Sequence, residues 1–419
     1  MPGSKRKITI LGGGFSGTLV AIEILRLAPL EPTLVRLVER DVTIGPGVAY
    51  RTRDRRHLLN VRTRSMSMDP RDPDHLLQWL RGPGTPHAKT WNASPDPNGF
   101  IPRGLYAEYV KDTLERAAER PGEGVTLERL PGCHAVTVET TGGSPCVLLE
   151  DGRRLESDAI VLALGNPPPS SPTPQTLPFY ESPRYVGDPW ADGVLDGMGA
   201  HERVLIVGTN LTMVDLVLSL ASRGHKGPID AISRHGLMSA RHAGEPGPML
   251  PPLVEDGKFP RVHHLVSAIR ERSTKHGDWR PVVDSFRREV SATWGRLSDE
   301  ERRRFLTHIR PFWEVHRHRA PIEIMDEIDR MRSDGTLRVR AARIRGMEER
   351  DDGVTVRIQP RGLSSIEEIV VDRVINATGP QSDYRVTDDP LPGALHAAGL
   401  VRPGPLDMGF DATPEGALL

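Results

Sequence analysis

The stretch Ile8-Thr9-Ile10-Leu11-Gly12-Gly13-Gly14-Phe15-Ser16-Gly17 decides the fold of the first part of the chain. Its apolar, β-branched opening predicts a strand, and the apolar spacing after Gly17 predicts a helix. Gly12, Gly14 and Gly17 satisfy the pattern G-x-G-x-x-G in the turn between them. Glycine is needed there because the turn is tight, the backbone must approach a pyrophosphate, and the helix must pack close to the strand.

A second predicted strand, residues 33–38, ends at the acidic residue Glu39. A carboxylate at this distance from the last glycine is placed to accept hydrogen bonds from a ribose. The glycine pattern alone is weak evidence, because such a turn can serve packing only. Strand, turn, helix and acid together predict a bound dinucleotide, without separating FAD from NAD. The predicted contacts are made by Gly12, Gly14, Phe15, Ser16, Gly17, Glu39 and Arg40.

The same pattern occurs twice along the chain. Each pass opens on an apolar strand that enters a glycine turn and closes on an apolar strand that ends in a glycine. The opening strands are expected at 8–11 and 204–207, and the closing strands end at Gly165 and Gly379. Strands alternating with helices are typical of parallel sheets built from βαβ units. The sequence therefore predicts an α/β fold with two Rossmann-like dinucleotide-binding units.

Composition excludes several classes of function. The 419 residues include 55 basic and 56 acidic side chains, so no global charge attracts nucleic acid or an anionic membrane. No stretch approaches the ~20 apolar residues that a membrane span requires. The two cysteines, Cys133 and Cys146, are spaced neither as a redox pair nor as metal ligands. We expect a cytoplasmic protein that acts on a small molecule, with no metal, and a homodimer is left open.

Several motifs lie between and after these elements. They are Gly45-Pro46-Gly47-Val48-Ala49-Tyr50, His57-Leu58-Leu59-Asn60-Val61, Met66-Ser67, Asp74-His75, Gln78-Trp79-Leu80, Ile101-Pro102-Arg103 with Tyr106 and Tyr109, and Gly187-Asp188-Pro189-Trp190. With these motifs the chain resembles a family of bacterial FAD/NAD(P)-binding oxidoreductases distantly related to flavin-containing monooxygenases and N-hydroxylases. The resemblance runs from the N-terminus to about Gly379.

The resemblance implies that the first unit binds FAD, that residues 45–69 fold over the isoalloxazine ring, and that the second unit presents NADPH. It places Asn60 near the flavin as the candidate catalytic residue, because flavin monooxygenases use an asparagine in a comparable Asn...Met...Asp-Pro context. A turn-capping role is the alternative. Further cofactor contacts are expected at His57, Asn60, Met66, Arg103, Val136, Gly165 and Gly379.

Two features depart from the monooxygenase pattern. The F-x-G-x-x-x-H fingerprint is absent, since Ala191 stands where the histidine belongs. Relatives also continue past the second closing turn into a strand and a helix that complete the flavin site, whereas this chain ends at Leu419. A truncated C-terminal element is therefore expected, and retention of FAD is left open.

The second turn differs from the first. It reads Gly208-Thr209-Asn210-Leu211-Thr212, with Asn210 in place of a glycine. Asparagine tolerates a positive φ better than most residues, so Gly208, Asn210 and Thr212 are still expected to contact a nucleotide. The next predicted strand ends in Arg234 rather than an acid. An arginine attracts a 2'-phosphate, which favours NADPH over NADH; a solvated surface arginine is the alternative.

The predicted organisation follows from a proline-rich stretch at 166–182. We expect an FAD-binding domain over 1–182, completed by about 370–419, and an NADPH-binding domain over 183–369 with a helical insertion at about 241–332. The leading hypothesis is an FAD- and NADPH-dependent monooxygenase that hydroxylates a small molecule, with nitrogen as one candidate position. The alternatives are an NADPH-dependent flavin reductase without oxygen insertion and a non-catalytic nucleotide-binding regulatory protein.

Overall fold

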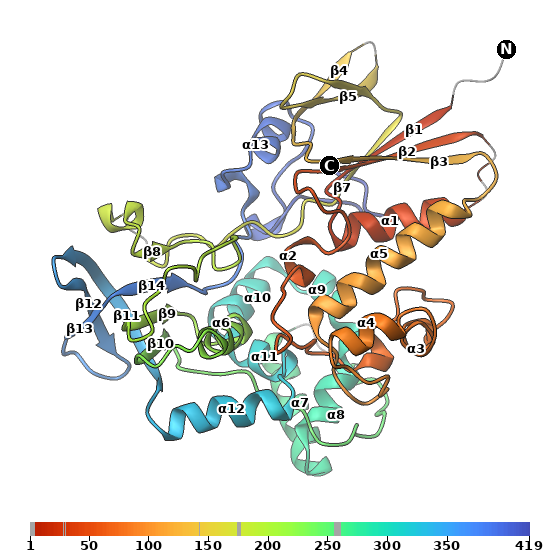
Figure 1. The fold of residues 1–419 in the computed structure, drawn as a ribbon. Coiled ribbons are helices and arrows are strands. Elements are labelled where there is room, and N and C mark those ends of the chain that lie inside the picture. The colour runs from red at the N-terminus through yellow and green to blue at the C-terminus, as the bar shows by residue number, and fades with distance from the viewer. Residues whose placement is uncertain (1–4, 28, 30, 142, 174–176, 255–260) are drawn as a thin grey trace. The chain divides into compact units, whose positions relative to one another are not determined.

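The computed structural model describes residues 5–27, 29, 31–141, 143–173, 177–254 and 261–419 (Figure 1). The chain forms two compact units, Met1–Pro167 with Gln381–Leu419 and Pro168–Pro380. Each unit contains parallel strands that alternate with helices. The predicted α/β fold with two dinucleotide-binding units is therefore confirmed.

Unit 1 is built on a four-stranded parallel sheet in the order β3-β2-β1-β7. Helix α1 packs against this sheet, and α5 packs against α1 (Figure 1). Apolar residues of β1, β2, α1 and α5 share one core, because each of these elements buries one apolar face there. The elements are β1 (Arg6–Leu11), α1 (Phe15–Arg26), β2 (Thr33–Glu39), α5 (Arg103–Glu119), β3 (Val125–Pro131) and β7 (Ala159–Leu162).

Smaller elements complete unit 1. A three-stranded antiparallel sheet contains the hairpin of β4 and β5. The C-terminal segment joins this unit through α13, whose Leu391 and Leu395 are buried in the core of that sheet. These elements are α2 (Gly47–Tyr50), α3 (His75–Arg81), α4 (Thr85–Thr90), β4 (Ala135–Thr141), β5 (Ser144–Leu149), β6 (Arg154–Glu156) and α13 (Pro390–Ala397).

Unit 2 contains a seven-stranded sheet in the order β13-β12-β11-β10-β9-β14-β8. The strands from β8 to β11 are parallel, and the β11-β12-β13 meander extends the sheet antiparallel. The elements are β8 (Tyr185–Val186), β9 (Val204–Val207), α6 (Leu211–Ser222), β10 (Ile229–Ser233), β11 (Leu337–Arg350), β12 (Gly353–Pro360), β13 (Glu367–Val371) and β14 (Arg373–Asn376).

Helices follow β10 where the helical insertion was expected. Ser298 caps α10 by accepting from the Glu301 N–H at 3.3 Å, but Glu301 does not return the bond. Its carboxylate instead accepts from the Val262 N–H at 2.7 Å, so it joins α10 to the start of α7. The helices are α7 (Val262–His276), α8 (Trp279–Phe286), α9 (Val290–Arg296), α10 (Asp299–Arg304), α11 (Arg310–Arg317) and α12 (Ile322–Ser333).

The division between the units lies at residues 167/168 and 380/381, whereas the sequence placed it at 182/183 and 369/370. The described part of the proline-rich stretch packs with unit 2. Phe179 is buried among strand residues of that unit, and the Asn376 side chain donates to the Ser170 carbonyl at 2.8 Å. None of the described helices is long and apolar enough to span a bilayer.

Candidate functional site

The first glycine turn has no room for side chains at two of its glycines. Gly12 has a φ of +102°, and a Cβ there would lie 2.2 Å from the Ala163 carbonyl oxygen. A Cβ on Gly17 would lie 1.8 Å from the Gly12 carbonyl oxygen. These two glycines therefore bring β1, β7 and α1 close together, as the motif requires. A Cβ on Gly14 would lie 3.3 Å from Gly47 Cα, so Gly14 faces the following loop instead.

Helix α1 begins at Phe15 and receives no side-chain cap from Gly14. The first N–H groups of a helix have no partner within the helix, and its macrodipole is positive at this end. Phe15, Ser16 and Gly17 supply these groups at the turn. The turn thus presents backbone donors with little side-chain bulk, which is the arrangement that a pyrophosphate needs.

Glu39 connects the end of β2 to the glycine turn. Its carboxyl group is buried, with 9% of the residue exposed, and one oxygen accepts from the Gly13 N–H at 2.7 Å. The other oxygen accepts from the Asp41 N–H at 2.9 Å. A carboxylate offers about four acceptor positions, so Glu39 keeps capacity for ribose hydroxyls. Arg40 beside it is exposed.

The loop at residues 45–50 lies directly on the glycine turn. The Gly45 N–H donates to the Gly13 carbonyl at 2.8 Å, and a Cβ on Gly47 would lie 3.1 Å from Gly14 Cα. Gly45 and Gly47 have φ angles of +117° and +54°, which favour glycine. The two glycine motifs therefore meet backbone to backbone, and the second half of this loop forms α2.

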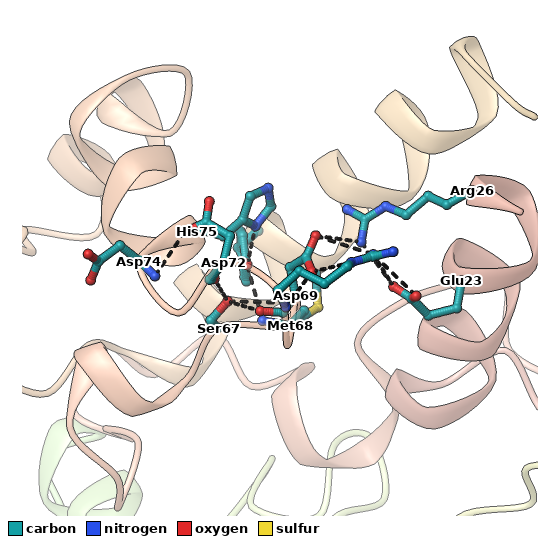
Figure 2. A network of polar contacts seen from close by, with 10 residues as sticks. Glu23, Arg26, Ser67, Met68, Asp69, Asp72, Asp74 and His75 are labelled. Carbon is teal, nitrogen blue, oxygen red and sulfur yellow. Dashed lines mark hydrogen bonds and ion pairs between the residues drawn. The ribbon is translucent and has the colours of Figure 1, made fainter.

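An ion-pair network anchors the far end of residues 45–69 (Figure 2). The Asp69 carboxylate pairs with Arg71 at 2.9 Å and with Arg26 of α1 at 3.0 Å. The hydrogen bond from Arg71 is the main cause that lowers the pKa of Asp69, partly opposed by burial. The Ser67 hydroxyl donates to the Asp72 carbonyl at 2.6 Å. In this arrangement Asp69 holds the segment to α1.

The other residues of this segment that are expected to contact the cofactor lie in or near a stretch whose backbone bonds to residues 101–103. The Arg103 N–H donates to the His57 carbonyl at 2.8 Å, and the His57 ring lies 2.7 Å from the Thr52 hydroxyl. Asn60 is partly buried in the same stretch, and Met66 packs against the core of unit 1. The backbone bond of His57 and the packing of Met66 thus fix the chain on either side of Asn60. Contact between Asn60 and a cofactor stays a prediction.

Two further residues expected to contact the cofactor are Val136, in the three-stranded antiparallel sheet, and Gly165, which follows the edge strand β7 of the parallel sheet. The register of β4 and β5 shifts between Ala135 and Thr137, so Val136 lies in an irregularity of the strand pair. Gly165, with a φ of +72°, accepts a hydrogen bond from the Tyr384 hydroxyl at 2.7 Å. The contact with Tyr384 was not expected from the sequence, because it joins positions far apart in the chain.

The second turn repeats the geometry of the first. Gly208 has a φ of +125°, and a Cβ there would lie 2.2 Å from the Ala377 carbonyl oxygen. Asn210 caps α6 with a φ of −99°, so the expected use of a positive φ at this position is wrong. The Asn210 side chain instead accepts from the Ser239 hydroxyl. Thr212 lies in the first turn of α6, and Gly379 has a φ of +94°.

Arg234 lies in a group of basic side chains at the end of β10. Arg234, Arg343 and Arg361 are exposed, and all three lower the pKa of His235, although burial is the larger cause. Among the described residues, none of these three guanidinium groups makes a hydrogen bond or ion pair. By contrast, the nearby Arg340 pairs with Glu367. An excess of unpaired positive charge at a strand end attracts an anion.

This basic group was only partly visible in the sequence. The β11-β12 hairpin brings Arg343 and Arg361 back to the loop after β10, where the Arg361 N–H donates to the Ala341 carbonyl at 2.8 Å. The loop itself packs tightly, since a Cβ on Gly236 would lie 2.9 Å from the Ala341 nitrogen. Phe312 of α11 is 42% exposed, and its ring centroid lies 5.5 Å from that of His235.

The first part of the chain is similar to a known protein family. Residues 9–167 match the model of a family described as FAD-NAD(P)-binding. A search of curated protein sequences gave no match for the chain. The family match covers β1, the glycine turn, β2 and the closing strand β7, which together form the candidate site of unit 1.

Several solved structures resemble 90% or more of the chain. Three of them are an ornithine N-hydroxylase from Kutzneria sp. 744 (15% identity, 90% of this chain, 81% of that chain, TM-score 0.56), L-lysine 6-monooxygenase from Pseudomonas syringae (18%, 99%, 87%, 0.56), and the FAD-bound cadaverine monooxygenase of desferrioxamine biosynthesis from Erwinia amylovora (13%, 98%, 85%, 0.62). At these identities the likeness concerns the fold.

The resemblance inferred from the sequence motifs is thereby confirmed at the level of the fold. The chain has the two-unit α/β fold of the ornithine, lysine and cadaverine monooxygenases, and its residues 9–167 resemble the FAD-NAD(P)-binding family.

Proposed function

We propose that the chain is an FAD- and NADPH-dependent monooxygenase that hydroxylates a small amine at nitrogen. The observation that carries this proposal is the paired glycine turn: Gly12 and Gly208 each approach an alanine carbonyl so closely that a Cβ would lie 2.2 Å from it. Each unit therefore has a backbone cradle for one dinucleotide. The family match supports FAD in unit 1, and the basic group supports NADPH in unit 2.

In unit 1 the residues fit FAD in three respects. The turn at Gly12, Gly14 and Gly17 lacks side chains and presents the N-terminus of α1 to a pyrophosphate. The buried carboxylate of Glu39 has acceptor capacity for ribose hydroxyls. The loop at residues 45–50 lies on the turn through backbone contacts. When bound, the flavin supplies hydride acceptance and oxygen activation, and the protein supplies position and electrostatics.

In unit 2 the residues fit a nucleotide with a 2'-phosphate. Arg234 directly follows β10, the strand that meets the adenosine ribose in this fold, and Arg343 and Arg361 lie close to the same loop. The exposed ring of Phe312 beside His235 offers an apolar surface for the adenine. Within the described part of the chain these three guanidinium groups have no partner. They repel one another, and an anion bound between them relieves the repulsion, which favours NADPH over NADH.

Asn60 is the proposed catalytic residue. It lies in the stretch that backbone bonds of Leu59 and Arg103 hold in place. An amide both donates and accepts, so Asn60 can hold the flavin and the spent nucleotide together and keep water from the reactive centre.

The proposed substrate class is supported by the structural neighbours, which are enzymes named for ornithine, lysine and cadaverine. These molecules share a primary amine at the end of a flexible alkyl chain, so we propose this chemistry for the substrate. The competing function is NADPH oxidation without oxygen insertion, for which the missing F-x-G-x-x-x-H fingerprint is the specific observation. We also propose a cytoplasmic location, and a homodimer stays a prediction for sedimentation analysis.

The test is product analysis with the FAD-loaded full chain. NADPH, oxygen and one candidate amine at a time are supplied, and NADPH consumption, hydrogen peroxide and hydroxylated amine are measured together. A monooxygenase forms hydroxylamine in proportion to NADPH when the correct amine is present. Stoichiometric peroxide with every primary amine tested would support the reductase function. Flavin retention without any NADPH consumption would support the regulatory protein.

A further inference from the structure

A continuous series of aromatic rings runs through unit 1 from the glycine turn toward the surface. The Tyr50 and Tyr106 ring centroids are 4.8 Å apart, those of Tyr106 and Tyr109 are 5.5 Å apart, and those of Tyr109 and Trp79 are 5.4 Å apart. We call Tyr50, Tyr106, Tyr109 and Trp79 the aromatic series. Tyr106, Tyr109 and Trp79 are at most 4% exposed, so water does not interrupt their contacts.

The two ends of the aromatic series lie in different surroundings. At the inner end, Tyr50 ends the loop that lies on the glycine turn, and its ring centroid is 5.4 Å from that of Phe15, the first residue of α1. At the outer end, Trp79 stacks on His87, with centroids 5.8 Å apart and 20° between the planes. His87 is exposed. The series therefore connects the proposed flavin-binding turn with the protein surface.

Two members of the series have a proton acceptor in place. The Tyr109 hydroxyl accepts from the Met68 N–H at 3.3 Å and lies 2.6 Å from His75 Nδ1, which can accept the phenol proton in the tautomer that carries its own proton on Nε2. Burial and the charge of Arg26 lower the pKa of His75, which keeps the ring neutral and able to accept. The Trp79 indole N–H donates to the Asp112 carboxylate.

Burial keeps the phenols of the series un-ionised at neutral pH. It raises the pKa of Tyr106 above its ordinary value and that of Tyr109 to about 12. A neutral tyrosine or tryptophan that loses an electron becomes a strong acid, so its oxidation is most favourable where a proton acceptor lies beside it. The contacts of Tyr109 with His75 and of Trp79 with Asp112 meet this condition.

We propose that the aromatic series is a relay that carries oxidising equivalents from the flavin-binding turn to the surface of the protein. The oxidant is a hydroxyl radical, formed when a ferrous ion cleaves hydrogen peroxide released near the flavin. The radical takes an electron and a proton from the Tyr50 phenol and becomes water. The protective purpose of the relay rests on the proposed function, because the peroxide comes from the flavin. The ability of the rings to conduct electrons does not depend on that function.

Electrons then move inward along the series. Tyr106, Tyr109 and Trp79 each give one electron to the preceding member, and Tyr50 regains a proton from solvent. The missing electron is finally taken from Trp79, and the indole proton of Trp79 passes to Asp112. A thiol from solution returns one hydrogen atom to Trp79 and is itself oxidised, while Asp112 releases its proton to water. The net reaction converts one hydroxyl radical and one thiol to water and a thiyl radical.

The test delivers an oxidant to the inner end of the relay without flavin. A ruthenium polypyridyl label is attached to a Val48→Cys parent, because Val48 is 38% exposed and lies in the same short helix as Tyr50. Cys133 and Cys146 are buried, so a thiol-reactive label added to the folded protein attaches at position 48. A laser flash with hexaammineruthenium(III) as electron acceptor makes the label a one-electron oxidant, and transient absorption follows amino-acid radicals.

The parent is expected to form a neutral tryptophan radical. Trp79→Phe should lose this signal, and Tyr106→Phe should lose it as well because the middle of the relay is broken. Trp91→Phe is the matched control, since Trp91 lies in the same unit but outside the series, and it should leave the signal unchanged. Asp112→Asn should convert the neutral radical to the protonated radical cation, a change that a packing role would not produce.

A tryptophan radical that persists unchanged in Trp79→Phe and Tyr106→Phe overturns the relay. Asp112→Asn, which alters a partly exposed side chain outside the aromatic core, gives a second test if a core variant folds poorly. Because no step of this experiment uses FAD, its failure leaves the proposed function intact. If the chain does not bind FAD, the relay loses its protective purpose. The flash experiment still decides whether the rings conduct electrons.

Discussion

Replacing Arg234 should separate NADPH from NADH. In Arg234→Gln the chain loses one of three exposed guanidinium groups near the loop after β10, and the glutamine keeps a polar side chain without the charge. A charge-assisted hydrogen bond contributes about 1.5 to 3 kcal/mol. Each 1.4 kcal/mol corresponds to about tenfold in affinity, so NADPH binding should weaken by roughly 10- to 100-fold. NADH has no 2'-phosphate, and its affinity should change less than about twofold.

The preference for NADPH should also depend on the salt concentration. Since Arg234, Arg343 and Arg361 are exposed, salt screens them, with a Debye length of about 10 Å at 0.1 M ionic strength. The preference for NADPH should therefore shrink as salt rises. Removal of Arg234 and Arg361 together should cost more than either removal, because both face the same anion.

Titration calorimetry of the protein with NADPH and NADH measures both affinities directly. The matched control is Arg345→Gln, because Arg345 is exposed on β11 but already bonds to Gln359. It should leave both affinities unchanged. Equal losses of NADPH and NADH affinity in Arg234→Gln would mean that Arg234 has a structural role, and an unchanged NADPH affinity would refute the 2'-phosphate site.

Three further predictions concern unit 1. Gly14→Val should abolish flavin absorbance after reconstitution while far-UV circular dichroism stays as in the wild type, because Gly14 faces the loop at Gly47 rather than the core; normal flavin content would contradict the cradle. Asn60→Ala should still consume NADPH but release more hydrogen peroxide per NADPH, and an unchanged peroxide yield would make Asn60 a turn residue. Asp69→Asn should melt at a lower temperature at pH 7. Since the folded-state pKa of Asp69 is lowered, its stabilisation is present above the usual carboxyl pKa near 4 and is lost as pH falls through the folded value, so the melting difference should vanish in acid.

The sequence predicted the first half of the site well because the relevant signals are local. An apolar strand, a glycine turn and a helix follow one another within a few residues, and Gly12 and Gly17 are required by contacts that any side chain would break. The alternation of strands and helices likewise predicts a parallel sheet. These features depend on neighbours along the chain, so a pattern can reveal them.

The features that sequence reasoning missed depend on tertiary contacts. Arg343 and Arg361 reach the end of β10 only because β11 and β12 form a hairpin. Asn210 has a negative φ because Gly208 alone makes the sharp bend of the second turn. Glu301 of α10 accepts a hydrogen bond from the Val262 N–H at the start of another helix, α7. In each case a distant segment competes with the local pattern and determines the contact.

The first closing turn shows the same dependence on distant residues. Tyr384 donates to Gly165, although the two residues are 219 positions apart in the chain. Resemblance to a family indicated that the C-terminal part completes the flavin site, but it gave no residue for this contact. The partner of a backbone carbonyl is set by packing, which periodicity and motif spacing do not encode.

Anaerobic reduction of the FAD-loaded chain tests the central claim most directly. The protein is reconstituted with FAD, freed of unbound flavin, and mixed with NADPH or NADH in a stopped-flow spectrophotometer without oxygen. The two-cradle account predicts that the protein retains flavin and that NADPH bleaches its absorbance at lower concentrations than NADH does. Retained flavin that neither nucleotide reduces, or a protein that holds no flavin at all, would contradict it.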